Sequence, residues 1–216
     1  MPDSKSALPP DRSQDKERGT TRRTFLKSAG LASASVAGLN LLEDVSYAQG
    51  NGSGGSTVGP GAVPLRLQIN GKPHMVNVEP RATLAEVLRD ELHMTGTKIV
   101  CDRGSCSACT VMLGKTPVCS CMTLAVDVGN RAISTVEGLA KGENLHPVQA
   151  AFVAHDALQC GFCTSGMVMS CAALMDRNPN PSITDVKTAI SGNICRCGTY
   201  PKVLEAVLTA SSGKGA

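Results

Sequence analysis

The sequence predicts an α+β fold in which a strand-rich half is followed by an all-helical half. Residues 63–138 alternate apolar and polar positions between turn residues, as strands do, whereas residues 145–210 change to a helical period. Each half also holds a set of four cysteines. The periodicity and the cysteines therefore predict the same division of the chain into two domains.

The first 48 residues read as an export signal, apart from the predicted fold. The segment Thr21-Arg22-Arg23-Thr24-Phe25-Leu26-Lys27 fits the twin-arginine pattern, and a weakly apolar stretch follows it. Small residues precede Gln49, so we expect a mature start at Gln49 and a periplasmic location. An ordinary basic signal for unfolded export is the alternative. The twin-arginine route, which serves folded cargo, suits a protein that acquires its metal before export.

The charge balance argues against a nucleic-acid partner. The chain has 21 Lys and Arg against 18 Asp and Glu, and residues 1–48 hold seven and six of these. The remainder, 14 against 12, gives a formal charge of +2, which is too weak to indicate nucleic-acid binding. No run of about 18 apolar residues follows the signal, so the sequence predicts no membrane span.

Turn and capping residues outline the strand-rich half. Residues 49–62 are rich in Gly and Ser and are expected to form a linker. Their apolar surface is too small for its burial to offset the conformational entropy that ordering would cost. Asn70-Gly71 between two alternating runs predicts a tight hairpin turn. Thr83 and Glu86 form a capping-box pattern, which predicts the start of a helix.

A loop over residues 97–108 holds three cysteines and leads into a second predicted hairpin. Its strands are expected at 110–113 and 118–124, with Cys121 on the return strand, and 132–136 is expected to close the sheet. A small mixed sheet around one helix is a ferredoxin-like β-grasp arrangement.

The second half is predicted to be an all-α four-helix domain. Pro147 suits a first helical turn, and helices are expected over about 166–176, about 183–191 and from Pro201. An antiparallel arrangement would bring both cysteine pairs of this half to one end of the bundle.

The two cysteine sets predict two metal centres. The first has the spacing C-x4-C-x2-C with a distant fourth cysteine, as in plant-type 2Fe-2S proteins, and comprises Cys101, Cys106, Cys109 and Cys121. The second joins C-x2-C to C-x-C across 31 residues and comprises Cys160, Cys163, Cys195 and Cys197. Two four-thiolate sites of this kind predict an electron carrier.

Three other uses of these cysteines have to be weighed. An oxidising periplasm favours disulfides, but the folded part is large enough to need none, and Cys195 and Cys197 are awkward to bridge. Zinc sites usually repeat C-x2-C with shorter insertions. A redox-active dithiol at Cys160 and Cys163 would leave the other pair unexplained.

The remaining candidate residues carry less information. Cys119 stands two positions from Cys121, so spacing alone leaves the fourth ligand of the first site open. Cys171 is expected to be a buried, inert thiol. The four histidines show no metal-pair spacing, and the sequence offers no catalytic residues.

With both sets in place, residues 63–210 strongly resemble the iron-sulfur subunit of molybdenum hydroxylases, the xanthine dehydrogenase and aldehyde oxidoreductase family. The resemblance rests on four segments in the family's order: CDRGSCSACTVML, VCSCMTLA, LHPVQAAFVAHDALQCGFCTSGM and GNICRCGTY. It implies one 2Fe-2S cluster in each half and Cys121 as the fourth ligand of the first. Departures include Val100 and Ser107, where the family usually has Gly.

The resemblance also implies partners. A large subunit would hold a molybdopterin cofactor close to Gln159 and Cys197, and electrons would pass from it through the helical-half cluster to the other. An FAD-binding subunit or a cytochrome would then accept them. Aldehyde oxidation is the first expectation, with an N-heterocycle dehydrogenase as the alternative. Two alternatives belong to other functional classes. One is a free-standing ferredoxin, and the other is a binding protein stabilised by zinc.

Overall fold

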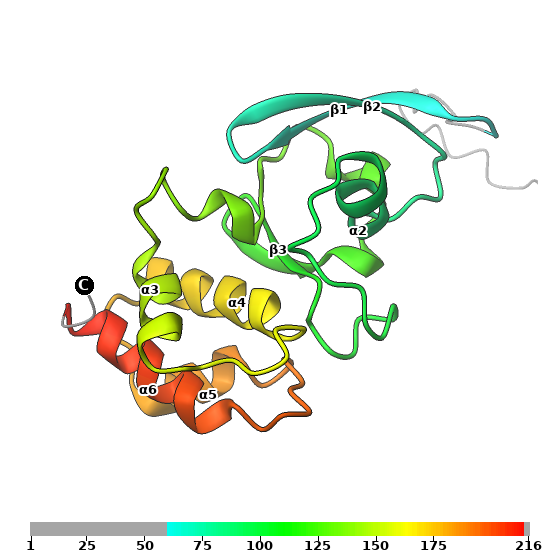
Figure 1. The fold of residues 1–216 in the computed structure, drawn as a ribbon. Coiled ribbons are helices and arrows are strands. Elements are labelled where there is room, and N and C mark those ends of the chain that lie inside the picture. Colours follow the sequence, from blue (N-terminus) through cyan, green and yellow to red (C-terminus); the bar gives the residue numbers. More distant parts are fainter. Residues whose placement is uncertain (1–59, 214–216) are drawn as a thin grey trace, which may run out of the picture. The chain divides into compact units, whose positions relative to one another are not determined.

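The first two strands form the predicted hairpin. In the computed structural model, which describes residues 60–213, β1 (Val63–Ile69) pairs antiparallel with β2 (Lys72–Val78) (Figure 1). Asn70 and Gly71 join them with φ angles of 51° and 77°, which a two-residue hairpin turn requires. The predicted signal and almost all of the predicted linker lie outside the described residues.

The five strands form a mixed sheet in the order β2-β1-β5-β3-β4. The short strand β5 (Ile133–Ser134) lies in its centre, parallel to β1 and antiparallel to β3 (Thr110–Leu113). The sheet together with the helices confirms the predicted α+β class and is consistent with a ferredoxin-like half. Strand β5 is shorter than the predicted 132–136, because a 3-10 turn begins at Val136.

The helix on this sheet begins where the capping box predicts. The Thr83 N–H donates to the Glu86 carboxylate at 2.7 Å, and the Glu86 N–H donates to the Thr83 hydroxyl at 3.3 Å. The α-helical part, α2 (Leu84–Glu86), is short and continues as a wider π-helical turn over Val87–Glu91. Its buried face comprises Leu84, Ala85, Val87 and Leu88.

The second hairpin differs from the prediction, which placed Cys121 on a strand over residues 118–124. Strand β4 (Thr116–Cys119) ends at Cys119, and Cys121 lies in a 3-10 turn, Ser120–Met122. The Ser120 N–H still donates to the Cys109 carbonyl at 3.3 Å, opposite it across the two strands. The chain then turns, because the Thr123 N–H donates to the Ser120 carbonyl at 3.3 Å and the Thr123 hydroxyl donates to the Cys119 carbonyl at 3.2 Å.

The helical half consists of α3 (Pro147–Ala154), α4 (Thr164–Arg177), α5 (Ile183–Ala189) and α6 (Tyr200–Ser211). Contacts join α3 to α4 and α6, and join α5 to the same two helices (Figure 1). The antiparallel order of the four helices stays a prediction. No helix within residues 60–213 has both the length and the apolar character needed to cross a membrane.

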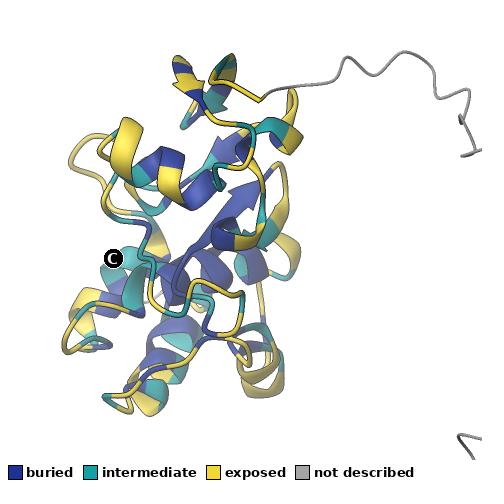
Figure 2. Ribbon diagram, turned by 90° about the vertical axis from the view of Figure 1, so that its right-hand side faces the viewer, coloured by how far each residue is buried: buried dark blue, intermediate teal, exposed yellow. Residues whose placement is uncertain are grey.

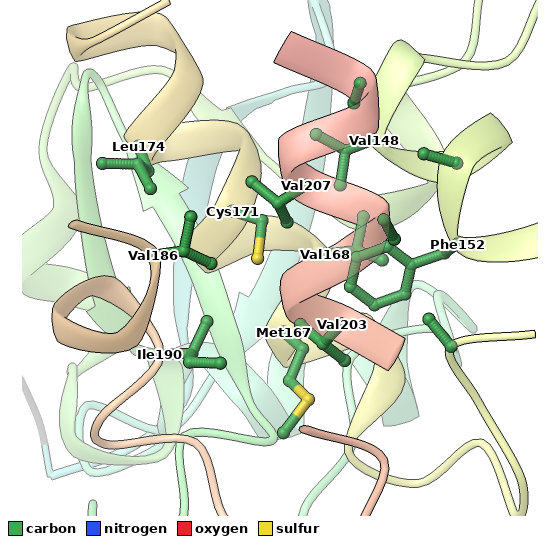
Figure 3. Close-up of a cluster of buried hydrophobic side chains, with 14 of the residues drawn as sticks. Val148, Phe152, Met167, Val168, Cys171, Leu174, Val186, Ile190, Val203 and Val207 are labelled. Carbon is green, nitrogen blue, oxygen red and sulfur yellow. The ribbon is translucent and has the colours of Figure 1, made fainter. Parts of the chain in front are cut away.

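Apolar side chains from all four helices meet in one core. Figure 3 shows Phe152, Met167, Val186 and Val207 around this core, and all of them are at most 2% exposed. Full burial of such a side chain stabilises a fold by roughly 1.5–3 kcal/mol. Cys171 is fully buried in the same cluster, which confirms its predicted burial.

The sheet and the helices share an apolar contact. Met112 of β3 packs with Met169 and Ala173 of α4, and these residues are buried. Figure 2 shows buried segments of strands and helices together in the interior. Val136 and Leu139, in the connection between the halves, pack on the same cluster. This contact fixes β3 against α4. Strand β3 follows the loop that holds Cys101, Cys106 and Cys109, and α4 follows the loop that holds Cys160 and Cys163.

Candidate metal centres

The loop that holds the first cysteine set turns its amide groups toward sulfur. Asp102, Gly104 and Ser107 have φ angles of 53°, 70° and 53°. The Gly104 N–H donates to Cys121 Sγ at 3.4 Å, and the backbone N–H groups of Arg103, Ser105 and Cys106 bond to the Cys101 thiol. Inward amides of this kind form a concave site for an anion, and an iron-sulfur cluster with four thiolates is anionic.

The thiols of the first set come together two by two. Cys101 lies in hydrogen-bond contact with Cys106, and Cys109 with Cys121. The last three are buried, whereas Cys101 is half-buried. Within residues 60–213, no three His, Cys, Asp or Glu side chains converge as the ligands of a single ion would. Paired thiols suit a two-iron unit, in which each iron takes two thiolates.

Two thiols of the first set have opposite pKa shifts. Hydrogen bonds from the Arg103 amide and the Cys106 thiol lower the pKa of Cys101 to about 7. Burial raises the pKa of Cys121 to about 12, so this thiol needs a bound cation to ionise at neutral pH. Bound iron supplies that charge, since a coordinating thiol loses its proton.

The second set is assembled from two loops. Cys160 and Cys163 precede α4, whereas Cys195 and Cys197 precede α6. The Sγ atoms of Cys160 and Cys197 lie 3.5 Å apart, and the Cys163 thiol bonds to Cys195. The inner two thiols are each 8% exposed, while Cys160 is exposed and Cys197 half-buried. One edge of this site therefore faces solvent, together with exposed Gln159.

Hydrogen-bond donors surround the second set as well. Burial opposes ionisation of Cys195, but bonds from the Thr199 hydroxyl and amide outweigh it and lower the pKa to about 7. The hydroxyl lies 3.2 Å from Cys195 Sγ. The Phe162 amide lowers the pKa of Cys160 in the same way. Cysteine spacing did not identify Thr199. The sequence signal that could have found it is a hydroxyl residue four positions after Cys195.

The loop of the first set directly touches the loop that leads to Cys195 and Cys197. The Ile194 N–H donates to the Cys106 carbonyl at 3.1 Å, and the side-chain amide of Asn193 donates to the Ser107 carbonyl at 3.1 Å. Asn193 is 3% exposed, yet sequence reasoning missed it because the partners are 86 residues apart. One hydrogen bond therefore joins a residue of the first set to the neighbour of Cys195.

Two of the histidines and Cys171 take part in the fold and not in a metal centre. The His146 side chain caps α3 by accepting from the Val148 N–H at 3.3 Å, and His155 pairs with Glu205 at 3.3 Å. Burial raises the pKa of Cys171 to about 12, which keeps this thiol protonated.

Two family descriptions match adjoining parts of this chain. Residues 67–134 match "2Fe-2S iron-sulfur cluster binding domain", and residues 135–208 match "[2Fe-2S] binding domain". The aldehyde oxidoreductase iron-sulfur-binding subunit PaoA of Escherichia coli is 40% identical over 171 residues, covering 72% of this chain and 75% of that protein. The chain belongs to the iron-sulfur subunits of the molybdenum hydroxylase family.

Two further relatives agree with this assignment. The 6-hydroxypseudooxynicotine dehydrogenase complex subunit beta of Paenarthrobacter nicotinovorans is 47% identical, over 69% of this chain and 94% of that subunit. The crystal structure of quinoline 2-oxidoreductase from Pseudomonas putida 86 superposes with a TM-score of 0.66 at 42% identity, over 72% of this chain and 99% of that one. This iron-sulfur subunit thus has two 2Fe-2S-binding regions and is part of an oxidoreductase complex.

Proposed function

We propose that this subunit conducts electrons through two 2Fe-2S clusters in a periplasmic molybdenum hydroxylase complex. Cys101, Cys106, Cys109 and Cys121 would hold the first cluster, and Cys160, Cys163, Cys195 and Cys197 the second. The observation that carries the proposal is the contact between the loops, with the Ile194 N–H 3.1 Å from the Cys106 carbonyl. This contact keeps two redox centres close enough for transfer between them.

The exposed edge of the second set supports contact with a molybdopterin-binding large subunit. Gln159 and Cys160 are exposed and Cys197 is half-buried, so a cofactor held by a partner can approach this edge. When bound, that cofactor supplies the two electrons released as the substrate is hydroxylated. The residues of this chain then hold the cluster and shield its inner thiols from water.

Apolar side chains beside the second set favour a subunit over a free-standing ferredoxin. Phe162 and Ile194 are 58% and 57% exposed, and each neighbours a cysteine of that set. A soluble carrier seldom leaves large apolar side chains uncovered around its redox edge, because such patches mark interfaces.

For the substrate, we propose an aldehyde, as the name of the E. coli relative indicates. A dehydrogenase of an N-heterocycle with a cytochrome acceptor is the second candidate, favoured by the 47% identity to the 6-hydroxypseudooxynicotine dehydrogenase subunit. An FAD-binding subunit is the proposed acceptor in the first case. The substrate site itself would belong to the large subunit, so residues of this chain do not choose between them.

The decisive experiment is low-temperature EPR of the dithionite-reduced native complex, with iron, sulfide and molybdenum measured on the same sample. We expect two distinct 2Fe-2S signals, with molybdenum copurifying. Two signals in a protein that never copurifies with molybdenum would favour the free carrier. Zinc in place of iron would refute electron transfer altogether.

A further inference from the structure

A fifth thiol, that of Cys119, lies against the first cysteine set. Strand pairing sets Cys119 opposite Thr110, the residue after Cys109. Its thiol reaches the Cys109 thiol and lies near Cys101. The four cysteines proposed as ligands leave this fifth thiol without a role.

The thiols of Cys119 and Cys121 both contact the backbone of Gly104. The Gly104 carbonyl lies 3.8 Å from Cys119 Sγ, while the Gly104 N–H donates to Cys121 Sγ at 3.4 Å. Both thiols also contact Cys109. An iron held by Cys109 therefore has two thiols within reach for its second protein ligand.

We propose that Cys119 is a reserve ligand of the first cluster, able to bind the iron that Cys121 holds. The inference rests on the proposed function, because it presumes a 2Fe-2S cluster on this set. In the exchange, the bond between iron and Cys121 sulfur would break, the released Cys121 sulfur would take up a proton from water, and the Cys119 S–H bond would break. A bond between iron and Cys119 sulfur forms, the thiol proton passes to water, and the iron keeps its oxidation state.

The surroundings of the two thiols explain why Cys121, and not Cys119, is the usual ligand of this iron. Cys121 is 5% exposed in a turn that Ser120 ties to the Cys109 carbonyl at 2.7 Å. Cys119 is only half-buried at the end of β4, and its thiol lies 3.8 Å from the Ser107 hydroxyl. A weak contact to a hydroxyl is easily given up for a bond to iron.

The test compares Cys121→Ala with Cys119→Ala/Cys121→Ala in the full native complex. Alanine leaves no oxygen that could replace the missing sulfur, so the two variants differ only in the reserve thiol. We expect Cys121→Ala to keep both EPR signals, the first with altered g-values, and to keep its iron. The double variant should lose the first signal and half of the iron and keep the second signal, which reports correct folding.

Cys106→Ala is the matched control, since it removes a buried thiol that is paired with Cys101 on the other side of the set. It should lose the first signal. Loss of that signal in Cys121→Ala, to the same extent as in the double variant, would overturn the inference. The proposed function would survive this result, since it depends on two signals in the unaltered protein.

A second measurement covers the case in which Cys121→Ala fails to fold. Cys119→Ala leaves the four proposed ligands intact and should show the same EPR signals as the unaltered protein. Under an iron chelator it should lose the first cluster several-fold faster, because an iron released by Cys121 is no longer recaptured. Equal rates of loss from the two proteins would contradict the reserve role.

Discussion

At the scale of single residues, one hydroxyl bears on the properties of the second cluster. Thr199 is 5% exposed, and its hydroxyl lies 3.2 Å from Cys195 Sγ. When Cys195 is a thiolate bound to iron, this hydroxyl can only donate. A donor to a cluster sulfur stabilises the reduced state, which has one more negative charge, and so raises the reduction potential.

We therefore expect Thr199→Val, which has nearly the same shape, to lower the midpoint potential of the second cluster. If the hydrogen bond is worth about 1 kcal/mol more to the reduced state, the shift is on the order of 40 mV. An EPR-monitored redox titration of the complex measures it. Thr199→Ser keeps the hydroxyl and should leave the potential near that of the unaltered protein. A potential unchanged in the valine variant would contradict the role given to Thr199.

A glycine decides how closely the two halves approach. Gly166 in the first turn of α4 faces the first cysteine loop, and a Cβ atom there would lie 2.1 Å from the Ser107 carbonyl oxygen and 2.9 Å from Ala108 Cα. Both are backbone atoms that a side-chain rotation cannot remove. Gly166→Ala should therefore destabilise the fold by about 1–3 kcal/mol and broaden both EPR signals.

Thermal unfolding of the complex, followed by loss of the cluster absorbance, tests this expectation. Gly192→Ala is a matched control, because its Cβ would meet only the Ser107 hydroxyl oxygen, at 3.1 Å. That oxygen can move with its side chain, so the control should change the melting temperature little. Equal effects of the two substitutions would mean that the close approach at Gly166 does not limit the packing.

At the scale of elements, the first hairpin is tied to the centre of the sheet by its own turn. The Asn70 side chain accepts from the Thr135 N–H at 2.9 Å and donates to the Thr135 hydroxyl at 3.0 Å. Thr135 is fully buried, so its amide has no access to water. These bonds hold the hairpin against the segment that leads into the helical half.

Asn70→Gly isolates these bonds, because glycine adopts the turn's φ of 51° without strain. It leaves the buried Thr135 amide without its partner, so we expect a loss of about 1–3 kcal/mol in the free energy of unfolding. Denaturant unfolding of the full chain gives this value. Gly71→Ala, which adds strain in the same turn without touching Thr135, separates a turn effect from a bonding effect. Wild-type stability in Asn70→Gly would show that the tie contributes nothing.

The elements also show where local sequence patterns suffice and where they fail. The Asn70-Gly71 turn and the Thr83 capping box were predicted correctly, because turn geometry and capping act between residues at most three apart. The strand through Cys121 was predicted wrongly, because the chain leaves β4 after Cys119 in a turn that the Thr123 N–H closes on the Ser120 carbonyl. Apolar alternation alone carries no information about such a contact.

At the scale of the whole molecule, the same distinction applies to the proposed centres. Cysteine spacing predicts two sets of four thiols, since metal ligands need particular types at particular separations, and the assignment of these thiols as ligands stays a prediction. It could not predict that the Asn193 amide reaches the Ser107 carbonyl, which joins the two sets. That bond depends on how α4 packs against β3 and how α5 packs against α4, and packing is a property of the complete fold.

Export across the membrane concerns the assembled complex. A cluster is normally built where iron, sulfide and reduced thiols are available, so a periplasmic iron-sulfur subunit has to fold and load its clusters before it crosses the membrane. The sequence around Arg22 and Arg23 predicts a signal for folded cargo. If the molybdenum subunit has no signal of its own, this pair exports both subunits together.

Changing Arg22 and Arg23 to Lys keeps the charge of the segment and removes the arginine pair. We expect both subunits to stay in the cytoplasm with their cofactors bound, because loading precedes transport in this order of events. Fractionation of cells into periplasm and cytoplasm, with immunodetection of each subunit and EPR of the cytoplasmic fraction, measures this. Lys27→Arg is a charge-matched control that leaves the pair intact and should export normally. Continued export of the large subunit in the double-lysine variant would show that it travels by a signal of its own.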